Sequence, residues 1–188
     1  MKLRAVAGFA LGLVMVGCSP DYVTDSQATV LLVVQSVNAG SPILSDVRGD
    51  TGTIINCQTQ VGLAVFPKNP QSVTVNTETV QLQRYDVSFV RSDGRAVEGV
   101  DVPYRFSAPM TASLAPGDTL SVAIDVVRHQ AKIEPPLSKI VGLDIVEMTA
   151  NVTFYGETLS RQSVSASGAA TIRFADYAEG TTTCESGT

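Results

Sequence analysis

The sequence has no tryptophan, a single histidine and only three cysteines among its 188 residues. Sugar sites commonly stack the sugar on exposed aromatic rings, so the lack of tryptophan gives little support to sugar binding. His129 stands without a Gly-x-Ser-x-Gly turn that would present a nucleophilic serine. Two cysteines and one distant histidine also fall short of the four clustered ligands that zinc takes. These scarcities predict a protein that is not an enzyme, uses no cofactor and has no zinc site.

Basic residues are few and form no cluster. Thirteen lysines and arginines stand against eighteen aspartates and glutamates. Nucleic acids and anionic lipid surfaces both attract proteins through clustered Lys and Arg side chains. The sequence therefore predicts no nucleic-acid partner.

Long apolar runs are missing as well, and the one short run lies at the N-terminus. Lys2 and Arg4 precede an uncharged apolar stretch at residues 5–16, and Gly17 and Cys18 follow it. As a helix this stretch rises about 18 Å, whereas about 20 residues are needed to cross a bilayer core. Its layout predicts a secretory signal peptide at residues 1–17 rather than a permanent membrane span.

The residues Met15-Val16-Gly17-Cys18 resemble the lipobox of bacterial lipoproteins, in which an aliphatic and a small residue precede an obligatory cysteine. Met15 departs from the leucine that is usual at its position. The resemblance implies that the signal is cut before Cys18 and that Cys18 is lipidated with fatty acyl chains such as palmitate. Ser19 implies transfer to the outer membrane, under the enterobacterial sorting rule. The alternatives are an ordinary cleaved signal and a structural apolar strand.

The other two cysteines form a natural pair once Cys18 is assigned to lipid. Export places Cys57 and Cys184 in an oxidising compartment in many bacteria, so we expect a disulfide between them. A bridge closing so long a loop contributes up to about 5 kcal/mol in the chain-entropy model. The alternative is two buried free thiols.

Loss of the signal peptide leaves eleven basic and eighteen acidic side chains, a net charge of −7.

The remaining chain predicts a short tether at residues 18–27 and a single all-β domain at residues 28–188. Apolar and polar residues alternate through much of this domain, and convincing helical periodicity is missing, so we expect an antiparallel two-sheet β-sandwich. Residues 111–126 resemble the strand, Pro-Gly turn and strand of immunoglobulin-like and fibronectin type III-like modules. Between Val80 and Phe89 the alternation slips, which predicts a bulge or a change of sheet near residues 83–84. The expected strands and the one candidate helical piece are Ala28–Val37, Gly62–Phe66, Val80–Phe89, Leu120–Val126, the hairpin Val146–Phe154 and Val164–Phe174 with Gly156 in its turn, and a helical Leu137–Leu143.

Few side chains suggest a binding site. Asp46 and Asp50 place carboxylates in a glycine-containing loop and are weak candidates for calcium, although the EF-hand spacing is missing. Tyr85 and Tyr104 fall in apolar patterns and are expected to be packed rather than displayed. We expect a lipid-anchored, non-catalytic protein that acts as an interaction or assembly module of the bacterial envelope, with an unidentified protein partner. The alternatives are a module that binds sugar or calcium and a hydrolase built around His129.

Replacing Cys18 by Ala is expected to release the protein from the membrane fraction. Each buried methylene of an acyl chain contributes about 0.8 kcal/mol to membrane binding, and the variant has no thiol to carry one. Fractionation of cells that express the full chain measures the effect, with Ser19→Ala as a control that keeps the thiol. Continued membrane association of Cys18→Ala would refute the lipid anchor.

Overall fold

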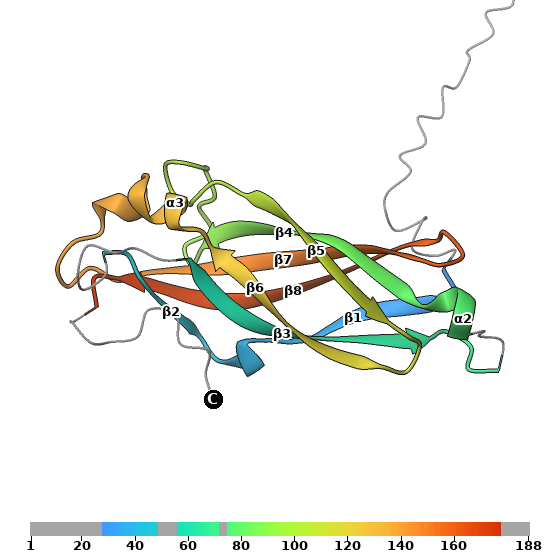
Figure 1. Cartoon of the computed structure of the whole chain (residues 1–188). Coiled ribbons are helices and arrows are strands. Elements are labelled where there is room, and N and C mark those ends of the chain that lie inside the picture. The colour runs from blue at the N-terminus through green and yellow to red at the C-terminus, as the bar shows by residue number, and fades with distance from the viewer. Residues whose placement is uncertain (1–27, 49–55, 72–74, 178–188) are drawn as a thin grey trace, which may run out of the picture.

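The computed structural model describes residues 28–48, 56–71 and 75–177, which form two packed β-sheets (Figure 1). One sheet has three strands in the order β1-β3-β6, and the other has five in the order β2-β8-β7-β4-β5. The predicted all-β, two-sheet architecture is confirmed, whereas residues 1–27, with the signal peptide and Cys18, lie outside the described residues. The strands are β1 (Val30–Val37), β2 (Ile43–Asp46), β3 (Cys57–Pro67), β4 (Val80–Arg91), β5 (Phe106–Leu114), β6 (Thr119–Val127), β7 (Val146–Thr158) and β8 (Ser163–Ala175).

The hairpin of β7 and β8 forms the middle of the five-stranded sheet. The two strands pair antiparallel from Val146 opposite Phe174 to Glu157 opposite Ser163. Alternate residues face inward because successive side chains of a strand point to opposite faces. Phe154 and Phe174 are fully buried there, within a core to which both sheets contribute. The hairpin predicted from alternation is confirmed, and both strands are longer than expected.

Strand β4 carries a bulge, one of the two outcomes that its slipped alternation predicts, and it does not change sheets. Its register with β5 and β7 shifts between Leu82 and Arg84, so that Leu82, Tyr85 and Val87 all face the core. Gly156 lies opposite Leu82 within β7. The prediction that Gly156 lies in the hairpin turn was therefore wrong. A Cβ at position 156 would lie 2.6 Å from the carbonyl oxygen of Gln81. Glycine is needed here because the bulged backbone approaches β7 too closely for a side chain.

The chain changes sheets between β1 and β2. The 3-10 turn η1 (Asn38–Gly40) has positive φ at all three residues, and the Asn38 side chain donates hydrogen bonds to the carbonyls of Ser41 and Pro42. Asparagine tolerates this backbone region better than most residues. The chain then enters β2, which pairs parallel with β8. The expectation of antiparallel pairing throughout was therefore wrong at this edge.

Short helices fill the connections. They are α2 (Val75–Glu78), α3 (His129–Ile133) and the 3-10 turn η2 (Leu137–Lys139), of which only η2 lies in the piece expected to be helical. The segments α2 and α3 contain four and five residues. A helix this short completes hardly more than one turn, so its sequence shows no 3.6-residue periodicity.

Tyr85 crosses the sandwich and links the two sheets. Its hydroxyl accepts a hydrogen bond from the backbone N–H of Asp125 at 3.1 Å and donates one to the Asp125 carbonyl at 3.3 Å. Its ring packs between those of Phe106 and Phe154. Burial raises the pKa of Tyr85. The phenol thus ties β4 of one sheet to β6 of the other, and the prediction that Tyr85 is packed is confirmed.

Replacing Gly156 by Ala is expected to lower the free energy of unfolding by about 1–3 kcal/mol, the usual cost of forcing an atom into a packed site. The added methyl group meets backbone that cannot rotate away. Denaturant unfolding measures the loss, with Ala169→Ser on the exposed face of β8 as a control. A Gly156→Ala variant as stable as the wild type would show that the bulge relaxes freely.

Candidate functional site

Two long connections meet at one end of the sandwich, which we name the loop end. They are residues 92–105, between β4 and β5, and residues 128–145, between β6 and β7. Figure 1 shows the first of these beside α3, at the end of the molecule opposite α2. Two cavities lie between them, of about 170 and 340 Å³. The smaller is lined by Tyr104, Phe106, Arg128, Ala131 and Pro135 among others, and the larger by Val100, Leu137, Ile140, Ile145 and Met148 among others.

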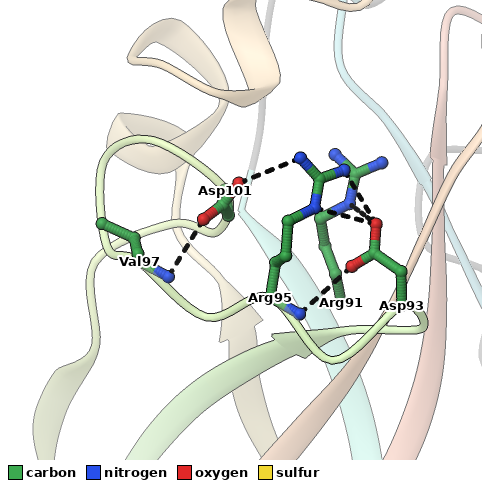
Figure 2. Close-up of polar contacts among 5 residues, drawn as sticks. All are labelled: Arg91, Asp93, Arg95, Val97 and Asp101. Carbon is green, nitrogen blue, oxygen red and sulfur yellow. Dashed lines mark hydrogen bonds and ion pairs between the residues drawn. The ribbon is translucent and has the colours of Figure 1, made fainter.

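The first connection is held in shape by charges within it (Figure 2). The Arg95 guanidinium lies 2.7 Å from a carboxylate oxygen of Asp93 and 3.4 Å from one of Asp101, and Arg91 lies 3.4 Å from Asp93. Asp101 also accepts a hydrogen bond from the backbone N–H of Val97. The hydrogen bond from Arg95 lowers the pKa of Asp93. The network fixes the loop and leaves little unbalanced charge on it.

Tyr104 is displayed on the same connection. Its side chain covers Gly99, whose φ is +74°, and a Cβ on Gly99 would overlap the tyrosine ring. Tyr104 nevertheless remains 58% exposed. The prediction that Tyr104 is packed was wrong, because the apolar pattern around it belongs to a loop and not to a strand.

The second connection is fixed by buried side chains. Leu137 and Ile140 enter the core, and the backbone N–H of His129 donates to the Asn56 side chain at 2.8 Å. Lys132 of α3 is only 1% exposed, and its Nζ has no hydrogen-bond partner among the described residues. Burial lowers the pKa of Lys132 to about 8, while the nearby Asp46 carboxylate acts in the opposite direction. Burial of this amine is costly, because its charged form loses water without gaining a full partner.

Apolar side chains project from both connections into solvent. Ten large hydrophobic residues are exposed within the described ranges, and seven of them belong to the loop end. Leu143 is fully exposed. Concentration at one end distinguishes this patch from the scattered apolar residues of an ordinary surface. The seven are Val97, Val100, Tyr104, Ile133, Val141, Leu143 and Ile145, and the other three are Leu31, Phe66 and Leu159.

The residues singled out from the sequence do not come together. His129 is exposed at the start of α3, and its imidazole has no hydrogen-bond partner in the described part of the chain. Asp46 is buried at the end of β2, where it accepts a hydrogen bond from the Arg48 N–H, and Asp50 lies outside the described residues. No group of three metal-ligating side chains occurs in residues 28–48, 56–71 and 75–177. The calcium suggestion stays a prediction.

The cysteine pair is described in part. Cys57 is fully buried at the start of β3, opposite Val127 of β6 and so close to the loop end. Cys184 lies outside the described residues. The bridge between Cys57 and Cys184 therefore also stays a prediction.

A polar groove of about 330 Å³ lies on the outer face of the five-stranded sheet. Asp86, Asn151 and Tyr155 line it. The sequence pattern contains no signal for Tyr155, because it occupies a solvent-facing position of an alternating strand. Asp86 already accepts a hydrogen bond from Ser107 and pairs with Arg84, whose guanidinium lies 4.1 Å from the Tyr155 ring centre. These groups satisfy one another, so the groove is a weaker candidate than the loop end.

Comparison with known protein families, with curated proteins and with solved structures finds no match. Among the helices that the structure describes, none is both long and apolar enough to cross a membrane.

Replacing Lys132 by Met is expected to stabilise the protein by up to about 3 kcal/mol at pH 7, the free energy that corresponds to the lowered pKa. Below about pH 8 both the folded and the unfolded chain hold the proton, so the wild type bears the full cost of burying the charge. Between about pH 8 and 10.5 the folded protein releases the proton while the unfolded chain keeps it. Wild-type stability therefore rises there relative to the variant.

Denaturant unfolding of both proteins across this pH range measures the difference, with the exposed Lys139→Met as control. A destabilised Lys132→Met variant, or a difference that does not change with pH, would contradict this account of the amine.

Proposed function

We propose that the protein is a non-catalytic interaction module of the bacterial cell envelope, anchored by lipid on Cys18, and that it binds another envelope protein through the loop end. The concentration of exposed apolar side chains at the loop end carries this proposal. Monomeric proteins rarely expose large contiguous apolar patches without a binding role. The two connections that bear the patch are held by buried anchors and ion pairs, so little ordering is needed on binding.

The charges of the loop end favour a protein partner with an apolar contact surface. Arg95 is neutralised by Asp93 and Asp101, and Arg105 lies 2.6 Å from Glu98. Basic groups satisfied in this way attract polyanions poorly. The apolar side chains between them are therefore the groups that gain most from leaving water.

The start of β1 and the loop end lie at opposite ends of the sandwich. The start of β1 is fixed at Val30, opposite Pro67 at the end of β3. The start of β3, Cys57, lies opposite the end of β6, from which the second connection leaves. The first strand thus begins at the end of the sandwich away from the loop end, an arrangement that supports binding of a partner at the loop end.

The same proposal includes two finer assignments. The sandwich is of the immunoglobulin-like class, supported by the predicted strand–turn–strand at β5 and β6, which passes from one sheet to the other. A Cys57–Cys184 disulfide would fasten the C-terminal segment beside the loop end, supported by the burial of Cys57 there. Outer-membrane localisation rests on Ser19.

Site-specific photo-crosslinking in intact cells tests the proposal. With a photoreactive amino acid in place of Leu143, the full-length protein is expected to form one adduct of defined mass with another envelope protein. The matched control carries the same amino acid at Leu159, which is exposed but lies at the β7–β8 turn. Val100→Ser is expected to reduce the Leu143 adduct by about tenfold, since burying one such side chain contributes about 1.5 kcal/mol or more.

Equal adducts from positions 143 and 159, or none from either, would overturn the loop end as the binding surface. Leu31→Ser, on β1, serves as the matched control for Val100→Ser, because it removes an exposed apolar side chain from outside the patch.

A further inference from the structure

Four strands form the edges of the two described sheets, and among them β6 is the one that no described feature protects. Strand β2 is four residues long, and β1 bends at a register shift between Val34 and Ser36. Strand β5 contains Pro109, and its Ser107 carbonyl accepts a hydrogen bond from Arg128. Short length, irregularity and proline are the usual protections of edge strands. Strand β6 has nine residues and none of these devices along Thr119–Ile124.

The Tyr85 hydroxyl shows which groups of β6 face outward. It bonds both the N–H and the carbonyl of Asp125, so these two groups point away from β3. Backbone groups alternate in direction along a strand, so those of Ala123, Ser121 and Thr119 point the same way. No described residue pairs with the outward groups of Ser121 and Ala123. The free edge thus runs from Thr119 to Ala123 and stops at Tyr85.

The apolar side chains next to this edge are incompletely covered. Leu120 and Val122 face the core but remain half-buried. On the facing edge strand β5, Ala108 and Met110 are half-buried in the same way. The sandwich is therefore open along the side between β5 and β6, and a strand added to β6 would cover Leu120 and Val122.

We infer that β6 pairs with β6 of a second copy of this chain in an antiparallel, two-fold symmetric arrangement centred on Ser121. In this register Ser121 lies opposite Ser121 of the second copy, Thr119 opposite Ala123 and Leu120 opposite Val122. The pairing forms about six main-chain hydrogen bonds and joins the two three-stranded sheets into one. Each half-buried apolar residue gains an apolar neighbour across the new pair.

The self-complementary register favours a second copy as the occupant, and charge does not oppose it. Two chains of net charge −7 repel each other in general, but residues 119–124 carry no charge. The flanking carboxylates also avoid each other, since Asp118 falls opposite Ile124 and Asp125 opposite Gly117. Like charges directly opposite would destabilise a strand pair, and this register has none. The pairing leaves the loop end of each copy uncovered, so it does not depend on the proposed function.

Cysteine crosslinking of the full-length protein tests the pairing and its register. Hydrogen-bonded antiparallel partners have Cα atoms about 5.5 Å apart, within the range that a disulfide spans. Ser121→Cys is therefore expected to give a disulfide-linked dimer under mild oxidation. Thr119→Cys is expected to give at least about tenfold less, because the two copies of position 119 would lie about 13 Å apart. Ser113→Cys on the protected strand β5 is the matched edge control.

A second variant separates pairing from folding. Ser121→Pro removes an N–H that points away from β3, so the existing ladder keeps its hydrogen bonds. It is expected to retain a cooperative thermal transition and to sediment as a monomer in detergent, whereas the wild type sediments as a dimer.

Three outcomes would overturn the inference: folded Ser121→Cys that stays monomeric, equal crosslinking at positions 119 and 121, or an adduct of Ser121→Cys with a different protein. The last outcome would assign the edge to a strand of that protein. The loop-end proposal is tested by crosslinking at position 143 and the β6 pairing by crosslinking at position 121. Each proposal can therefore fail independently of the other.

Discussion

Burial of one face of every long strand is the constraint on which the rest of the molecule depends. Phe154 and Phe174 from the five-stranded sheet and Val61 and Leu63 from the three-stranded sheet are fully buried in one core. With about 25 cal/mol gained per Å² of apolar surface removed from water, this contact supplies the main favourable term of folding. The bulge in β4 and the glycine opposite it follow from the same constraint, because they return Tyr85 to the inner face after the alternation slips.

The places where this burial is incomplete are the places where function is proposed. At the loop end, Leu137, Ile140 and Lys132 hold a connection against the core while the side chains beyond them remain in water. Along the side between β5 and β6, Leu120 and Val122 pack against the core but remain half-buried. Tyr85 connects the two regions, since its bond to Asp125 fixes the distal end of β6 and ends the free edge there.

The fold could be predicted wherever alternation extends over many residues. The hairpin of β7 and β8 and the slip in β4 could be predicted because inward residues are apolar and their neighbours along the strand are polar. Helix α3 could not be predicted, because five residues are too few to show the 3.6-residue periodicity of a helix. Nor was the parallel pairing of β2, since four residues carry too little pattern to specify an edge or a direction. Of the candidate site, the sequence offered Tyr104 only as a packed residue, because an apolar loop and an apolar strand share one composition.

Alternation and motif spacing were enough to predict the all-β class, the long hairpin and the irregularity in β4, and they gave the expectation of a lipid anchor at Cys18. Each of these is a local property that depends on the spacing of residues close together in the sequence. The three-dimensional arrangement was needed to show that residues 92–105 and 128–145 meet at one end, that Lys132 is buried, and that β6 lies at an edge that no described strand covers. These features depend on which strands become neighbours. That choice is made by the summed burial of distant segments, which no short stretch of sequence contains.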